Sequence, residues 1–376
     1  MDNKNIYFDI SATTPLDKNV AQLMYDANIS LFGNPSSIHS FGQRARAQIE
    51  ISRKKIASAI GCSSGEIIFT SGGSESNNHV LKSLLSPGDH IITSSYEHPS
   101  ILETLEKIDE IEVSYIDPNL KGQVSPESIK SLIKSNTKLI SIMWANNEIG
   151  TINDIESISD IASINGIIFH SDAVQAFGKI PIDLSKTKID FMSITAHKIY
   201  GPKGIGALYI KNGNTINPLV TGGGQEHNLR AGTENTGSIV GFGAAAEIAC
   251  VEIDKHISFV NDLENRFINR LNKALIEFSI NGQERLPGVF NICFKRINGS
   301  DFLMNMDIEG IAISYGSACS SGSLKPSATL SKCGISKDIA ESSIRISFGR
   351  LNTIDEIDFF VDKVKKYSSS LVNSNG

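Results

Sequence analysis

Lys198 is the first residue whose position suggests chemistry. It lies in the segment Ser193–Gly206, between the apolar runs 189–194 and 207–210, which are typical of buried strands because glycine and proline bound them. A lysine held between buried strands is partly desolvated, which favours the neutral amine that forms a Schiff base. Most lysines instead lie on solvated loops, so the neighbours of Lys198 must decide between the two interpretations.

Cys319 is a second candidate, in a run of small and polar residues from Ser314 to Ser327. This composition predicts a mobile loop, and a flexible loop of this length spans on the order of 20 Å, enough for a thiol to visit a buried site and then face a partner. Only the thiolate is nucleophilic, so Cys319 would need activation near neutral pH. An incidental exposed cysteine is the alternative. Cys293 lies in a predicted strand and is expected to be a core thiol.

Polar residues follow several successive apolar runs, at the point where each run ends. In chain order they are the glycine-rich segment 71–78, His98, Asn147, Asp172 and Lys198. Strands that alternate with helices imply a largely parallel sheet covered on both faces. Ligands of such sheets bind beyond the carboxyl ends of the strands, so we expect these residues to meet in one crevice. This expectation favours a chemical role for Lys198.

The segment 71–78 is a candidate phosphate site. Gly72, Gly73 and Ser74 stand between a predicted strand and a predicted helix, where backbone N–H groups meet the positive end of the helix. The glycines match neither the dinucleotide pattern nor the P-loop, so the anion need not belong to a nucleotide. An ordinary helix cap is the alternative.

Asp172 and His98 suggest a planar cofactor. An aspartate at the end of a buried strand needs a partner, and a protonated pyridine nitrogen would serve. That pair, together with a lysine Schiff base, is typical of pyridoxal phosphate enzymes, and an imidazole such as His98 can lie on the cofactor's face. Asp172 could instead cap the next helix.

Two arginines lie in residues 343–350, which alternate like a strand. The arginine fork binds a carboxylate through two parallel bonds, as an amino-acid substrate would require. A surface ion pair is the alternative, and it suits Arg350 better than Arg345.

Composition limits the class of protein. The 376 residues are 40% hydrophobic and 20% charged, and the formal net charge of −6 gives no basic surface for direct nucleic-acid binding. The N-terminus has no apolar signal core and no stretch is long enough to span a membrane, so we expect a cytoplasmic protein without a membrane partner. The five cysteines lack the spacing of a metal site and suit a reducing compartment.

The length of the chain predicts two domains, because it exceeds the usual size of one hydrophobic core. Residues 15–260 are expected to form a large α/β domain. Residues 1–14 with 261–376 are expected to form a smaller α+β domain that carries the cysteine loop.

Hydrophobic spacing predicts helices over 42–59, 237–255 and 257–278. His39, just before the first of these, could be a ligand but is more simply a cap-region side chain. The polar tail after Lys366 is expected to fray.

Taken together, these motifs resemble those of the pyridoxal-phosphate-dependent cysteine desulfurases of the NifS/IscS type, within the class V aminotransferases. The resemblance runs from Phe8 to about Arg350, and its motifs are specific only in combination; they lie at 70–78, 97–98, 146–150, 172–175, 197–204 and 316–321. It implies the fold type I of pyridoxal phosphate transferases, with a mostly parallel seven-stranded sheet in the large domain.

The resemblance also implies roles for individual residues. Lys198 would bind the cofactor covalently, and His98 would stack on its ring and assist proton transfer. Asp172 would hold the ring nitrogen, and Gln175 the phenolic oxygen, with Asn147 beside it. The phosphate would be held by Gly73, Ser74, Thr195 and His197, and by Thr233 of the partner subunit in a homodimer.

The implied reaction converts L-cysteine to L-alanine. Arg345, with Asn147, would bind the substrate carboxylate, and Cys319 would take the sulfur as a persulfide for a sulfur-acceptor protein, either an iron–sulfur scaffold or a thiolation enzyme. The chain ends at Gly376 without the longer extension that IscS-type members use for scaffold docking, which leaves the acceptor open. Alternatives are another class V enzyme, an aminotransferase or β-lyase, and a sulfur carrier without turnover.

Overall fold

The computed structural model describes residues 5–316 and 326–374, and its largest element is a seven-stranded sheet of order β2-β8-β7-β6-β5-β3-β4. The strands are β2 (Ile67–Thr70), β3 (His90–Ser94), β4 (Glu112–Ile116), β5 (Thr137–Ser141), β6 (Ile168–Asp172), β7 (Phe191–Thr195) and β8 (Gly206–Ile210). Only β8 runs antiparallel to its neighbours. The predicted α/β fold with a mostly parallel seven-stranded sheet is therefore confirmed.

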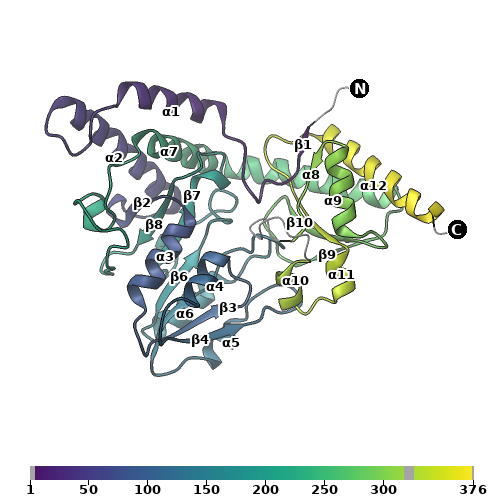
Figure 1. The fold of residues 1–376 in the computed structure, drawn as a ribbon, viewed down its shortest axis with the longest axis horizontal. Helices are drawn as coiled ribbons and strands as arrows, with labels where there is room; N and C mark the ends of the chain where they lie inside the picture. The colour runs from purple at the N-terminus through teal and green to yellow at the C-terminus, as the bar shows by residue number, and fades with distance from the viewer. Residues whose placement is uncertain (1–4, 317–325, 375–376) are drawn as a thin grey trace.

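Helices cover both faces of this sheet (Figure 1). They are α1 (Lys18–Ser30), α2 (Ser40–Ile60), α3 (Gly73–Leu84), α4 (Pro99–Leu105), α5 (Pro126–Ser131), α6 (Ile155–Ile164) and α7 (Thr236–Val251), with short 3-10 turns η1 (Ser64–Glu66), η2 (Leu184–Lys186), η3 (Ala196–Lys198) and η4 (Glu226–Asn228). Along β2, Ile67 and Phe69 pack into a core with α2, α6 and α7, whereas Ile68 packs into a core with α3 and α4. Side chains of a strand alternate between faces, so a strand covered on both faces is apolar throughout.

α2 illustrates how local sequence sets an element. His39 Nδ1 accepts a hydrogen bond from Gly42 N at 3.3 Å, which makes His39 the N-terminal cap that we expected rather than a ligand. The helix ends at Gly61, whose φ of 72° lies in the left-handed region that glycine adopts at low cost. Ala45 and Ile49 lie on the buried face.

A smaller sheet has its own core. β9 (Phe278–Asn281), β10 (Val289–Phe294) and β12 (Ser343–Ser347) form an antiparallel sheet, and β1 (Ile6–Tyr7) pairs with β11 (Ile311–Ala312). They pack with α8 (Ile253–Lys273), α9 (Gly299–Ile308) and α12 (Ile354–Ser374), while α10 (Ala328–Lys332) and α11 (Lys337–Glu341) lie nearby (Figure 1). Phe8 joins this core with Phe267, Phe290 and Phe348. The shared core supports our proposal that residues 1–14 belong with 261–376, although α8 runs on through residue 260.

Boundary predictions for three helices were wrong. The helix predicted over 237–255 ends at Val251, and the next begins at Ile253 rather than 257, because the chain bends by 70° between them and Glu252 leaves helical geometry (φ −102°, ψ 14°). That second helix ends at Lys273 rather than 278, because Phe278 already begins β9. The tail predicted to fray after Lys366 is helical as far as Ser374. Tyr367 and Leu371 pack against the smaller core and hold that last part of α12 in place.

Among the described residues, no single helix has the length and apolar character needed to cross a membrane. The bent pair α7 and α8 meets those two criteria only when both helices are counted together.

His170 makes the fold sensitive to acid. It lies at the centre of β6, fully buried between Ser141 and Ser193, and burial lowers its pKa to about 3. The unfolded state, with a histidine pKa of about 6.5, binds the proton first as the pH falls, so stability is lost between about pH 6.5 and pH 3. Wild type should lose about 2 kcal/mol more than His170→Gln when the pH falls from 6.5 to 5. Urea unfolding at both pH values checks this, and equal losses would contradict it.

Candidate active site

A cavity of about 260 Å³ lies at the carboxyl ends of the central strands. This is near the lower end of the volumes of small-molecule sites, roughly 300–1,000 Å³. Most of the residues that we predicted line it, namely Gly73, Ser74, His98, Asn147, Asp172, Gln175, Thr195, His197, Lys198 and Arg345. Thr233 does not line it and is exposed, and Cys319 lies outside the described residues. The polar strand ends thus meet in one crevice, as the sheet topology predicts.

Lys198 ends the 3-10 turn that follows β7. Its Nζ donates to Ser11 O at 2.6 Å and to Ala12 O at 2.7 Å, so the N-terminal segment forms the opposite wall. Gly201 allows this tight turn, because a Cβ there would lie 2.8 Å from Ala196 O. Lys198 is therefore a half-buried amine in the cavity wall, and the interpretation as a solvated loop lysine is wrong.

The N-terminus of α3 is open toward the cavity. No side chain caps it at Gly72, and within the described residues no acceptor meets the backbone N–H groups of Gly73 and Ser74. A Cβ on Gly73 would lie 2.5 Å from Val174 Cγ2, so only glycine lets the two walls approach this closely. Open N–H groups at the positive end of a helix are suited to a phosphate.

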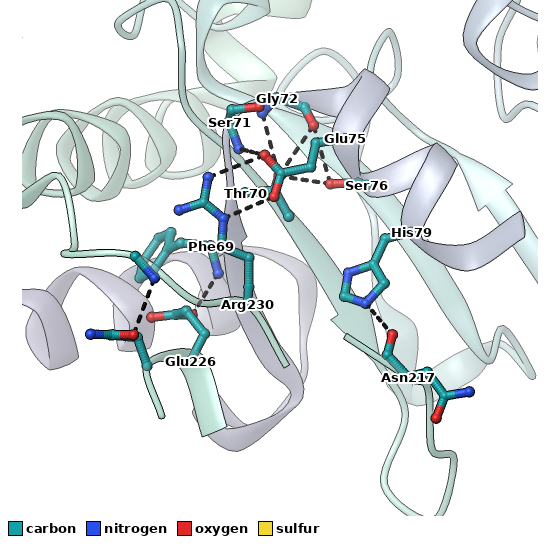
Figure 2. A network of polar contacts seen from close by, with 12 residues as sticks. Phe69, Thr70, Ser71, Gly72, Glu75, Ser76, His79, Asn217, Glu226 and Arg230 are labelled. Carbon is teal, nitrogen blue, oxygen red and sulfur yellow. Dashed lines mark hydrogen bonds and ion pairs between the residues drawn. The ribbon is translucent and has the colours of Figure 1, made fainter. Parts of the chain in front are cut away.

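Arg230 neutralises the one carboxylate in the first turn of α3. Figure 2 shows the Glu75 side chain held by Ser71 N at 2.8 Å and by Arg230 Nε at 2.9 Å. Burial raises the pKa of Glu75, but these hydrogen bonds outweigh it and the pKa lies below its usual value. An anion at this helix end would otherwise meet an unpaired negative charge. This pairing could not be predicted, because the two residues are far apart in the chain.

Asp172 is buried at the end of β6 and does not cap a helix, because the following residues form turns. Its Oδ1 accepts from Val174 N at 3.0 Å and its Oδ2 accepts from Asn77 Nδ2 at 2.7 Å. Each carboxylate oxygen has room for a further donor. Asp172 can therefore still accept a bond from a cationic N–H in the cavity.

A chain of hydrogen bonds connects Asp172 with His98 through two residues that we did not predict. Asn77 Nδ2 also donates to Ser100 Oγ at 2.9 Å, and Ser100 Oγ lies 2.8 Å from His98 Nδ1. His98 Nδ1 accepts from Ser100 N at 3.1 Å, so a neutral imidazole carries its proton on Nε2. Asn77 lies within the segment 71–78, but nothing in the sequence indicated that its side chain reaches Ser100.

Three more cavity residues have fixed orientations. Gln175 Nε2 donates to Ser11 O at 2.9 Å, and Thr195 Oγ1 donates to Ile205 O at 3.1 Å. His197 Nδ1 lies 3.1 Å from Thr13 Oγ1. Burial, with the nearby cation of Lys198, lowers the pKa of His197 to about 4. His197 is therefore neutral at pH 7.

Arg345 on β12 closes the side of the cavity that faces the smaller sheet. It is 2% exposed, and its guanidinium donates to Asn147 O at 2.9 Å, to Asp9 Oδ1 at 2.7 Å and to Ser314 Oγ at 3.1 Å. Its Nε is buried and has no hydrogen-bond partner among the described residues. A carboxylate in the cavity could satisfy it. Arg350 instead forms an ion pair with Asp17, which was the expected alternative to binding a substrate carboxylate.

Burial makes the described cysteines poor nucleophiles. It raises the pKa of Cys62 and of Cys333 to about 12 and that of Cys250 to about 11, and it also raises the pKa of Cys293. Cys293 is buried in β10, which confirms that it is a core thiol. None of these thiols is appreciably ionised near neutral pH.

Comparison with known proteins gives consistent matches over nearly the whole chain. The family model of class V aminotransferases matches residues 6–360. The cysteine desulfurase IscS of Dictyoglomus turgidum is 44% identical, over 98% of this chain and 95% of its own. A solved NifS-like protein superposes with a TM-score of 0.91 at 35% identity, over 97% of this chain and 99% of its own. The solved structure described as SspA in complex with cysteine has a TM-score of 0.81 at 37% identity, over 93% of this chain and 100% of its own.

Proposed function

The chain belongs to the class V aminotransferase family, and from this premise we propose that it is a cysteine desulfurase, which converts L-cysteine to L-alanine and passes on the sulfur. Cysteine desulfurases of this family depend on pyridoxal phosphate. The observation that carries the proposal is the meeting of an amine, a buried carboxylate and a buried guanidinium in one cavity, contributed by Lys198, Asp172 and Arg345.

The cavity fits pyridoxal phosphate in this proposal. Gly73 and Ser74, with Thr195 and His197, would hold the phosphate at the open end of α3, where the glycine leaves space that a Cβ would fill. Asp172 would accept from the ring nitrogen, using its free lone pairs. The cofactor would supply an electron sink for negative charge that develops on the substrate carbon next to the amine, and Lys198 would be the residue that holds it.

The cavity residues would orient the substrate and move its protons. Arg345 would bind the carboxylate of L-cysteine, and Asn147, whose carbonyl already holds the guanidinium, would stand beside it. His98 carries its proton on Nε2 when neutral, so it would donate from that atom, whereas Lys198 would take and return a proton at Nζ. His197 would stay neutral and act as a hydrogen-bonding group, since its pKa of about 4 excludes a positive charge at pH 7.

Cys319 would be the nucleophile toward sulfur. Its thiolate would attack the substrate sulfur, so that a sulfur–sulfur bond forms while the carbon–sulfur bond breaks and its electron pair stays with the carbon. Protonation of that carbon gives L-alanine, and Cys319 is left as a persulfide. The raised pKa values of the four described cysteines support this choice, because each of them is held as a neutral thiol.

We also propose a homodimer in which Thr233 of the partner subunit reaches the phosphate. Large apolar side chains on α1 and the loop after it support an interface, since Tyr25, Ile29, Phe32 and Ile38 are 64–92% exposed. The persulfide would then go to an acceptor protein, an iron–sulfur scaffold or a thiolation enzyme. The described cysteines are all free, which supports a reducing, cytoplasmic location.

The product from L-cysteine tests the proposal. Purified protein loaded with pyridoxal phosphate and given L-cysteine with a thiol reductant should release alanine and sulfide in equal amounts. A β-lyase would release pyruvate and sulfide instead, and an aminotransferase would need an added 2-oxo acid. A sulfur carrier would give no turnover. Pyruvate as the main product, or no alanine, would overturn the proposal.

A further inference from the structure

Lys179 lies outside the active-site cavity and contacts Gln175, one of the residues that line it. Its Nζ donates to Gln175 Oε1 at 2.8 Å. The chain between them is a tight turn in which Phe177 N bonds Ala173 O and Ile180 N bonds Ala176 O, so side chains four residues apart lie on the same side. Lys179 is not among the site residues predicted from the sequence.

Lys179 and Gln175 line different cavities. Gln175 lines the cavity of about 260 Å³, whereas Lys179 lines a smaller and mainly apolar cavity of about 60 Å³ with Ile199 and Val260. Lys198 lines both. Among the described residues, Lys179 is thus connected to the active-site cavity by its hydrogen bond to Gln175 and does not itself line that cavity.

The partners of Gln175 determine which way its amide points. Ser11 O is an acceptor and takes a bond from Nε2 at 2.9 Å, whereas the Lys179 ammonium has only donors and must meet Oε1. If the amide were flipped, Oε1 would face the Ser11 carbonyl oxygen and the NH₂ group would face the Lys179 ammonium. Neither hydrogen bond could then form. In the observed orientation Nε2 keeps a second N–H that has no acceptor among the described residues, and Gln175 lines the active-site cavity.

The charge of Lys179 fits a site for an anionic ligand. Burial, together with the cations of Lys198 and Arg345, lowers the pKa of Lys179 to about 7. A phenolate oxygen or a phosphate in the adjoining cavity would favour the ammonium form again, because a nearby opposite charge stabilises it.

We propose that Lys179 is a positioning residue that fixes the Gln175 amide so that its Nε2–H faces the phenolic oxygen of the bound cofactor. The inference rests on the proposed function. Without Lys179, Oε1 would be buried without a hydrogen-bond partner. The observed orientation of the amide would then lose the contact that favours it, and the amide could rotate. The phenolic oxygen would then lose its donor and become more basic, so the bound cofactor would give up its proton only at a higher pH.

A double-mutant cycle on the loaded enzyme tests this, with the pH midpoint of the cofactor's visible absorption band as the readout. Lys179→Met should raise the midpoint by about one pH unit, the size of one lost hydrogen bond. Gln175→Met should raise it at least as much, and the double variant should match Gln175→Met alone. Lys179→Arg, which keeps the donor and the charge, should stay close to wild type. If Lys179→Met does not fold, Lys179→Ala removes the same donor without adding bulk.

The outcomes separate this inference from the proposed function. Lys179→Met could shift the midpoint as much in the Gln175→Met background as in wild type. That result would mean that the charge of Lys179 acts directly on the cofactor, and it would overturn the positioning role. No shift at all would overturn it too. In both cases the wild type would still show the cofactor band and release alanine. A wild-type protein without the band would overturn the proposed function and this inference together.

Discussion

Lys198→Ala is expected to abolish turnover of L-cysteine and to remove the visible absorption band of the bound cofactor. The Nζ atom lies in the cavity wall between β7 and the N-terminal segment, and among the residues that the structure describes no other lysine lines this cavity. In the proposed function Lys198 both holds the cofactor and moves the substrate proton, so its loss should lower the rate by at least about 10³-fold. Absorption spectra and alanine measurements on the purified variant check both effects.

A matched control for Lys198→Ala is Lys186→Ala, because Lys186 is an exposed lysine paired with Asp183 away from the cavity. This control should keep the absorption band and the rate of wild type. A Lys198→Ala protein that remains folded and still forms alanine at a wild-type rate would contradict the assignment of Lys198.

Cys319→Ala is expected to lower alanine formation by about 10³-fold or more while leaving the cofactor band in place. In the proposed function the described cavity binds the cofactor, whereas a thiolate removes the sulfur from the substrate. The thiols of half-buried Cys62 and buried Cys333, each with a pKa raised to about 12, cannot replace it. Steady-state alanine formation and the absorption spectrum, measured on one preparation, separate the two steps.

Cys62→Ala is the control for Cys319→Ala, since it removes a thiol without touching the cavity. It should turn over L-cysteine like wild type. If Cys319→Ala instead retained full alanine formation, the reaction would not need a cysteine nucleophile, and a lyase or transaminase mechanism would be the better account.

Most of the large sheet could be predicted because its central strands are buried on both faces. β3, β7 and β8 are buried at every position, and each contains adjacent apolar residues bounded by polar or glycine residues. The same fact predicts the cavity, since polar side chains at the ends of parallel strands must share one edge. Lys198, Asp172 and His98 meet there for this reason.

The partners of the cavity residues could not be predicted, because they come from distant parts of the chain. Asp9 lies at the N-terminus, yet it pairs with Arg345 on β12. Ser11 accepts from both Lys198 and Gln175 although neither is near it in sequence. Such contacts depend on how the smaller sheet packs beside the large one, which residue types and spacing do not encode locally.

The helix ends were hard to predict for a different physical reason. α7 is apolar on all sides and α8 follows it after one residue, so hydrophobic spacing alone shows no break at Glu252. The end of α12 has polar composition, and only the packing of Tyr367 and Leu371 on the smaller core holds it helical. In both places tertiary contacts, rather than local helix preference, determine where the helix ends.

The most direct test of the account is the mass of the Cys319 peptide after the wild-type protein, loaded with pyridoxal phosphate, has reacted with L-cysteine without reductant. The account predicts one additional sulfur atom on that peptide, together with free alanine, and no additional sulfur on the peptides of Cys62, Cys250, Cys293 and Cys333. Alanine that accumulates while the Cys319 peptide stays unmodified would contradict it.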